Sequence, residues 1–124
     1  MELPARKTTK SVGDAAEDRA LAHLRAAGLR LVERNYRTPG RGGGEVDLIL
    51  REPGGTLVFV EVRARASHGF GGAAASVGPA KQARLVRAAR SYLLRLPAPP
   101  PCRFDVVAID SGQLQWLRGA FDAG

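Results

Sequence analysis

The fold is decided by residues 45–65, whose sequence is EVDLILREPGGTLVFVEVRAR. Apolar, strand-forming residues dominate both ends of this stretch, and Glu52-Pro53-Gly54-Gly55 between them is a turn sequence typical of hairpins. We therefore predict two strands, over residues 45–51 and 56–65, that pair in antiparallel fashion.

The polar side chains of this hairpin are predicted to share one face. Residues two apart on a strand point the same way, so Glu61 and Arg63 emerge together while Val60 emerges on the opposite side. Asp47, on the first strand, can approach Glu61 across the pair if the register allows. Because charged side chains on an otherwise apolar strand need a reason, Asp47, Glu61 and Arg63 are the first candidates for a functional site.

The segments that flank the hairpin alternate between helix and strand. Ser11 suits an N-cap and Gly28 a stop signal for the first helix, and Pro79 suits the first turn of the second. The predicted order is αβββαββ, an α/β fold with a mixed β-sheet flanked by helices. A flexible basic arm over residues 1–10 is expected to precede a single domain over residues 11–124. The flanking elements are helices over residues 13–27 and 79–96 and strands over 29–34, 103–109 and 113–117.

Composition restricts the class of protein. Nineteen Lys and Arg against 12 Asp and Glu give a formal charge of +7, which favours a polyanionic partner or an anionic membrane surface. Cys102 is the only cysteine, and His23 and His68 are isolated, so neither an intramolecular disulfide nor a zinc site is expected. No apolar run approaches the length of a membrane span. We expect a cytoplasmic protein without a membrane partner.

Six short motifs, taken in sequence order, resemble those of a known family. They are Gly13 with Glu17, GEVDLI at residues 44–49, FVEVRAR at 59–65, GGAAASV at 71–77, Lys81-Gln82, and RFDVV at 103–107. Together they are similar to the YraN family of bacterial predicted endonucleases, and the match covers nearly everything from Ser11 onward. The resemblance implies a restriction-endonuclease-like fold, similar to that of archaeal Holliday-junction resolvases, within the PD-(D/E)xK nuclease superfamily.

The resemblance also implies a metal-dependent site. Asp47 and Glu61 would hold a divalent cation, Mg²⁺ or Mn²⁺, and Glu17 from the first helix would complete the acidic cluster. The chemistry agrees, because phosphodiester hydrolysis needs a hard cation to neutralise charge on the phosphate and to acidify a bound water. Glu17 shares a helix stripe with Ala20 and Leu24, so its alternative interpretation is a polar residue at the edge of that stripe.

Arg63 departs from the superfamily pattern, which places a lysine two residues after the glutamate. Arginine has a pKa of about 12 or more, so it can clamp a phosphate but cannot act as a general base. The base would then be a metal-bound hydroxide or a neighbouring carboxylate, Glu17 or Glu45. The same departure supports an alternative function, a nucleic-acid-binding module that keeps the nuclease architecture without hydrolysis.

Five basic residues are candidates for contact with nucleic acid: Lys81, Arg41, Arg65, Arg84 and Arg87. Lys81 lies at the start of the second helix, where backbone N–H groups also favour anions. DNA is the expected substrate, and the resemblance suggests branched or Holliday-junction-like structures. A homodimer is a reasonable expectation, because two symmetrically placed cuts require two sites. An adaptor for an acidic protein also fits the charge, but it leaves the acidic cluster unexplained.

Simpler interpretations exist for several of these side chains. The helix arginines can form a solvated face, and Glu61 with Arg63 can be a solvated ion pair worth about 0.2–1 kcal/mol. Asp105 is expected to be structural, paired with a nearby arginine. Tyr36 and Trp116 could stack on bases, but packing within the protein is the preferred interpretation.

Overall fold

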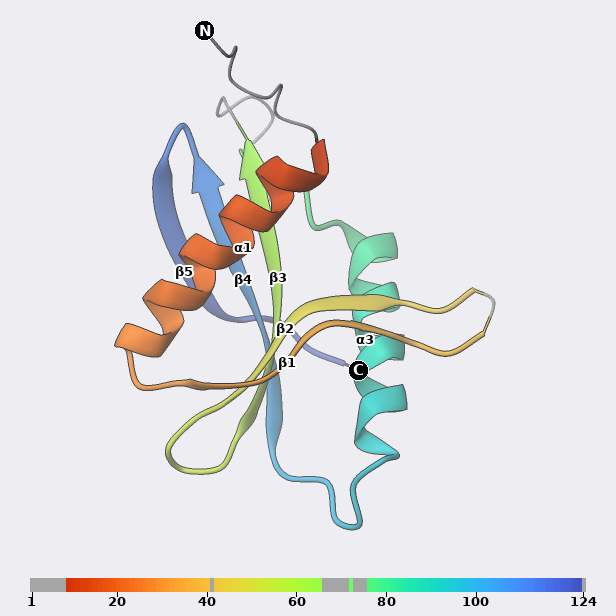
Figure 1. The fold of residues 1–124 in the computed structure, drawn as a ribbon. Coiled ribbons are helices and arrows are strands. Elements are labelled where there is room, and N and C mark those ends of the chain that lie inside the picture. Colours follow the sequence, from red (N-terminus) through yellow and green to blue (C-terminus); the bar gives the residue numbers. More distant parts are fainter. Residues whose placement is uncertain (1–8, 41, 66–71, 73–75, 124) are drawn as a thin grey trace, which may run out of the picture.

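The computed structural model describes residues 9–40, 42–65, 72 and 76–123. The helices are α1 (Thr9–Ala26) and α3 (Pro79–Leu93), and the strands are β1 (Arg30–Arg37), β2 (Glu45–Arg51), β3 (Leu57–Arg65), β4 (Cys102–Asp110) and β5 (Gln113–Phe121). The predicted α/β class and the order αβββαββ are therefore confirmed (Figure 1). Neither of these two helices is long and apolar enough to cross a membrane.

The five strands form one mixed sheet in the order β1-β2-β3-β4-β5. Neighbouring strands are antiparallel except β3 and β4, which are parallel. A parallel pair needs a long crossover connection, and the chain makes it through α3. Figure 1 shows α1 crossing one face of the sheet and α3 lying against the other.

Each helix closes its own hydrophobic core against one face of the sheet. On the α1 side, Leu24 is fully buried with Leu48 and Val60, and the predicted apolar stripe of this helix is confirmed. On the α3 side, Leu85 is buried with Phe59. Ala88, Ala89 and Tyr92 are also buried on this side of α3, while Gln82, Val86, Leu93 and Leu96 are only partly buried.

Several element boundaries differ from those predicted. α1 begins at Thr9 instead of Gly13, so the assignment of Ser11 as its N-cap is wrong. The last two residues of the predicted arm, 9 and 10, belong to this helix, and residues 1–8 lie outside the described part of the chain. β1 continues past the predicted residue 34 to Arg37, because Tyr36 and Arg37 still pair with β2 although Asn35 between them and Arg34 takes a left-handed conformation (φ 56°). α3 ends at Leu93, short of the predicted residue 96.

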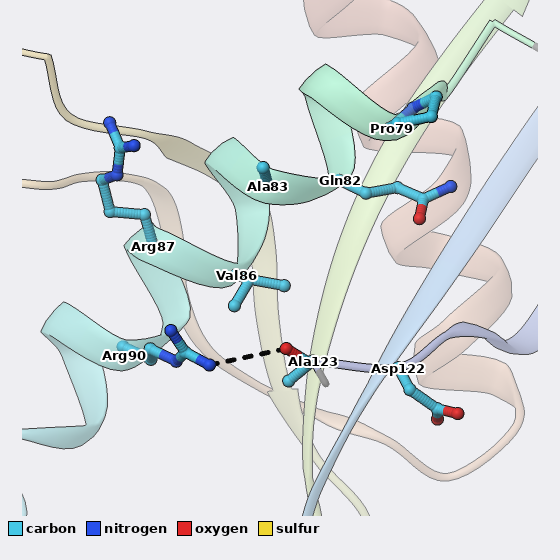
Figure 2. Close-up of a pocket in the computed structure, with 8 residues that line it drawn as sticks. All are labelled: Pro79, Gln82, Ala83, Val86, Arg87, Arg90, Asp122 and Ala123. Atoms are coloured by element: carbon cyan, nitrogen blue, oxygen red, sulfur yellow. Dashed lines mark hydrogen bonds between the residues drawn. The ribbon is translucent and has the colours of Figure 1, made fainter.

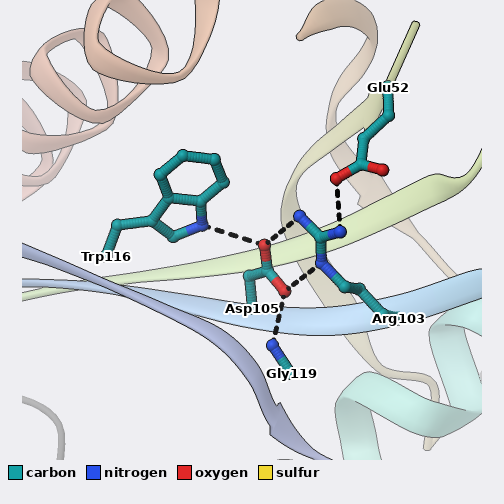
Figure 3. Close-up of polar contacts among 5 residues, drawn as sticks. All are labelled: Glu52, Arg103, Asp105, Trp116 and Gly119. Atoms are coloured by element: carbon teal, nitrogen blue, oxygen red, sulfur yellow. Dashed lines mark hydrogen bonds and ion pairs between the residues drawn. The ribbon is translucent and has the colours of Figure 1, made fainter. Parts of the chain in front are cut away.

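Asp105 is structural, as predicted, and its partner is Arg103 (Figure 3). The buried carboxylate accepts two hydrogen bonds from Arg103, at 2.9 and 3.1 Å, one from Trp116 Nε1 at 2.9 Å and one from the Gly119 amide at 2.9 Å. Arg103 also pairs with Glu52 in the β2–β3 turn. The register of β4 and β5 shifts beside Asp105, so this carboxylate holds the irregular end of β5, which continues past the predicted boundary at residue 117.

Candidate active site

The hairpin register brings Asp47 and Glu61 together where β2 and β3 separate. The ladder between these strands runs from Arg51↔Leu57 to Leu48↔Val60, which places Asp47 directly opposite Glu61 at the next position. There the Val62 amide donates to Asp47 Oδ2 at 2.8 Å, so a side chain takes the place of the next ladder hydrogen bond. The sequence did not determine this register, and the observed one places the two carboxylates opposite each other.

Both carboxylates lie in surroundings that disfavour their charge. Glu61 is only 3% exposed, which rules out the solvated ion-pair interpretation. Burial, followed by the negative charge of Asp47, raises the pKa of Glu61 to about 8. Burial also raises the pKa of Asp47, opposed by the hydrogen bond from the Val62 amide. Because the two buried carboxylates repel each other, a positive charge nearby stabilises their ionised forms.

Two basic side chains supply such a positive charge next to Glu61. Lys81 Nζ lies 3.4 Å from Glu61 Oε1, and Arg63 Nη1 lies 3.8 Å from the same oxygen. Arg63 Nε also donates to Ser76 Oγ at 2.9 Å, which fixes one edge of the guanidinium. The sequence predicted Lys81 as a phosphate contact but gave no sign of its ion pair with Glu61, because only the packing of α3 on the sheet brings them together.

Glu17 lies beside this pair but is bound to another partner. Arg34 Nε contacts Glu17 Oε1 at 3.2 Å, and Arg34 Nη1 contacts Asp18 at 2.7 Å. Burial and then the charge of Asp47 raise the pKa of Glu17, so the two carboxylates interact electrostatically. Arg34 belongs to no sequence motif, and sequence reasoning missed it for that reason. The role of Glu17 as a third metal ligand stays a prediction.

A polar hollow of about 510 Å³ opens next to Glu17. Its lining includes Asp14 from α1, Glu45 from β2 and Arg37 from β1. Arg37 contacts Glu45 at 3.7 Å, so this second candidate base is also held in an ion pair. The hollow thus exposes Glu17 and Glu45 to solvent, and neither Asp47 nor Glu61 is among the described residues that line it.

The donor set suits a hard cation that takes few protein ligands. Mg²⁺ prefers carboxylate oxygens and keeps several waters, and Asp47 and Glu61 supply two carboxylates on facing strand positions, whose pKa values burial raises. Among the described residues, no group of three or more His, Cys, Asp or Glu is arranged to hold a metal ion. Asp47 and Glu61 are the two residues that would hold a cation here, with water as its other ligands.

The predicted nucleic-acid contacts fall into separate places. Arg84 and Arg87 are exposed on α3, where Arg87 donates to the Gly42 carbonyl in the β1–β2 loop. Arg65 is exposed at the end of β3, and Arg41 lies outside the described residues. Arg84 and Arg87 therefore place positive charge on the exposed surface of α3, the helix that also carries Lys81.

A further hollow, of about 540 Å³, lies on the other side of α3 and contains none of the acidic pair. It is formed between α3 and the segment that follows β5, and Arg90 reaches across it to the Ala123 carbonyl at 3.4 Å (Figure 2). Among the described residues that line it, Asp122 is the one acidic side chain, so this hollow lacks a pair of carboxylates. The buried acidic pair of the described residues is Asp47 and Glu61, at the other site.

Comparisons with known proteins agree on one family. The sequence pattern described as "Uncharacterised protein family UPF0102" matches residues 16–109. The chain is 72% identical to a UPF0102 protein of Acidovorax sp. (strain JS42) over 120 residues, which covers 97% of this chain and 90% of that one. It is 70% identical to a UPF0102 protein of Paracidovorax citrulli (strain AAC00-1) over 121 residues, with the same two coverages of 97% and 90%. No solved structure gives a significant match.

Proposed function

This chain belongs to the uncharacterised protein family UPF0102, and we propose that it is a divalent-metal-dependent endonuclease that hydrolyses phosphodiester bonds in DNA. The observation that carries the proposal is the buried pair Asp47 and Glu61, placed opposite each other at the point where β2 and β3 separate. The resemblance of its motifs to those of the YraN family and the PD-(D/E)xK nucleases supports the same conclusion.

Each residue of the site has a role in this proposal. Asp47 and Glu61 hold Mg²⁺ or Mn²⁺, and a cation bound there supplies charge neutralisation and an acidic water. The Val62 amide orients Asp47 through its hydrogen bond to Oδ2. Arg63, fixed by Ser76, presents its remaining N–H groups to the scissile phosphate. Glu17, whose pKa is raised by burial and by the charge of Asp47, is proposed as the third acidic residue of the site.

Two features of the chain support a nucleic acid as the ligand, and the choice of DNA rests on the resemblance to the nuclease family. The chain carries a net charge of +7, and exposed Arg84 and Arg87 extend a basic surface along α3. Phosphate contacts of this kind position a nucleic acid without reading its sequence. We propose that the protein acts on branched DNA as a homodimer, since a four-way junction needs two symmetrical cuts; light scattering should then give a dimeric mass.

The test is a cleavage assay on linear, flapped, single-stranded and four-way-junction DNA with Mg²⁺, Mn²⁺ or EDTA. Asp47→Asn and Glu61→Gln should abolish cleavage, because each removes a ligand charge while keeping the shape of the side chain. Glu33→Gln is the matched control, since Glu33 pairs with Arg95 on the surface of β1. Full activity in both site variants would refute the proposed nuclease site.

A nucleic-acid-binding module without hydrolysis is the second candidate function. It is favoured by Arg63 in place of lysine and by the ion pairs that already balance Glu61 through Lys81 and Arg63. This alternative predicts band shifts without product under every metal condition, and binding that weakens steeply with salt as counterions are released. Metal-dependent product that disappears in Glu61→Gln would exclude it.

A further inference from the structure

Lys81 reaches the site from a different element than the acids do. It lies in the first turn of α3, and its ammonium is 3.4 Å from Glu61 Oε1. The Lys81 side chain keeps 30% of its surface exposed, whereas that of Glu61 keeps 4%. The ammonium therefore lies at the boundary between a buried carboxylate and solvent, where it can move without burying or exposing a large surface.

The two cations around Glu61 differ in how firmly they are held. Arg63 is anchored by its hydrogen bond to Ser76 and contacts Glu61 at the longer distance of 3.8 Å. Lys81 has a flexible four-carbon stem and a compact charge with rotatable donors; among the described residues its ammonium forms one ion pair, with Glu61, and its charge also lowers the pKa of Asp47. Lys81 is thus the cation of this site that can exchange partners.

A divalent cation on Glu61 and the Lys81 ammonium cannot share the carboxylate without repulsion. Like charges a few ångströms apart repel strongly when water is partly excluded. The first turn of α3 contains no acidic side chain, Pro79 occupies its start and no side chain caps it. A released ammonium there has no carboxylate on its own helix turn to bind, and the helix terminus itself favours an anion.

We propose that Lys81 is an exchangeable partner of Glu61. It pairs with the Glu61 carboxyl group while no divalent cation is bound, and once a cation occupies the Asp47–Glu61 site, Lys81 binds a backbone phosphate of the nucleic acid. Nucleic acid is thereby held at the site more strongly when the site is loaded. This inference rests on the proposed function, because it requires that Glu61 takes a divalent cation.

The first experiment measures Mn²⁺ binding by calorimetry without nucleic acid. Lys81→Met removes the competing charge, so we expect Mn²⁺ to bind about five- to tenfold more tightly than to the wild type. Arg90→Met removes the same charge from an exposed position further along α3 and should change Mn²⁺ affinity less than about twofold. Equal or weaker Mn²⁺ binding in Lys81→Met would overturn the inference.

The second experiment measures the salt dependence of binding to a junction DNA, with Ca²⁺ or with EDTA. In Ca²⁺ the slope of log K against log salt should fall by about 0.9 in Lys81→Met, the value for one phosphate contact. In EDTA the slope should equal that of the wild type, because Lys81 is then occupied by Glu61. A slope for Lys81→Met that does not depend on Ca²⁺ contradicts the exchange.

The two experiments separate failure of this inference from failure of the proposed function. If the wild type binds no Mn²⁺, or binds it as well as Glu61→Gln does, the metal site itself is wrong and the inference is lost with it. If Mn²⁺ binding depends on Glu61 but not on Lys81, the metal site stands and Lys81 is only a structural partner of Glu61.

Discussion

Glu61→Gln is expected to stabilise the metal-free protein at neutral and alkaline pH. The folded protein raises the pKa of Glu61 to about 8 from an ordinary value of 4.5. A carboxyl whose pKa is raised by folding binds more protons in the folded state than in the unfolded state, so its contribution to stability falls as pH rises from the lower value to the higher one. Glutamine resembles the protonated glutamic acid in shape and carries no charge to bury.

The size of the effect follows from the two pKa values. Each unit of difference corresponds to about 1.4 kcal/mol. Ionisation of Glu61 costs the folded state about 1 kcal/mol at pH 5.5, about 3 at pH 7 and about 4 at pH 8. The wild type should therefore lose about 3 kcal/mol of unfolding free energy between pH 5.5 and pH 8 that Glu61→Gln does not lose.

Urea unfolding in EDTA, followed by circular dichroism at several pH values, measures this difference. The wild type and Glu61→Gln should have similar midpoints at pH 5.5 and diverge as pH rises, while the surface control Glu33→Gln should follow the wild type throughout. Parallel curves for the wild type and Glu61→Gln would refute the reasoning, because Glu61 would then be ionised at no cost to the fold.

Three further predictions test the site and its support. At pH 8, Mn²⁺ should raise the urea midpoint of the wild type but not of Glu61→Gln, since only a bound ligand stabilises the folded state; an equal rise in both would place the ion elsewhere. Asp105→Asn should cost about 3–5 kcal/mol in urea unfolding, because it breaks a buried ion pair with Arg103, and cleavage by the folded fraction should persist; loss of cleavage without loss of stability would contradict a purely structural role. Gly44→Ala should cost about 3 kcal/mol because the added methyl would lie 1.8 Å from the Arg84 carbonyl oxygen, whereas Gly54→Ala, with open space around it, should be nearly neutral; similar stability of the two variants would show that α3 moves freely.

The hairpin could be predicted from the sequence because its signals are local. Alternation and the turn at residues 52–55 predicted the strand over 45–51 as observed, but the register that places Asp47 opposite Glu61 came only from the structure. The predicted ranges of β1 and β5 ended too early, at residues 34 and 117, where the observed strands continue to Arg37 and Phe121. Asn35 and Gly119 both take left-handed conformations inside strands, and both strands continue past them because of contacts distant in sequence.

The ion pairs that join different elements of the site could not be predicted. Such a pair depends on the height and rotation of a helix over the sheet, and neither is encoded in a local pattern. Arg34 meets Glu17 because β1 passes beneath α1, and Lys81 meets Glu61 because α3 begins next to the end of β3. Sequence reasoning therefore identified Asp47, Glu61 and Arg63 on the hairpin, but it assigned neither Arg34 to Glu17 nor Lys81 to Glu61.

The height of α3 over the sheet is set by one close contact. A Cβ at Gly44 would overlap the Arg84 carbonyl, so the start of β2 and the backbone of α3 touch with no side chain between them. Gly44 comes shortly before Asp47 on β2, and Arg84 lies one turn after Lys81 on α3. The contact thus fixes the strand that carries Asp47 against the helix that carries Lys81. A larger residue at position 44 would lift α3 from the sheet and lengthen the Lys81–Glu61 ion pair. We therefore expect Gly44→Ala to bind Mn²⁺ more tightly than the wild type, in the same direction as Lys81→Met.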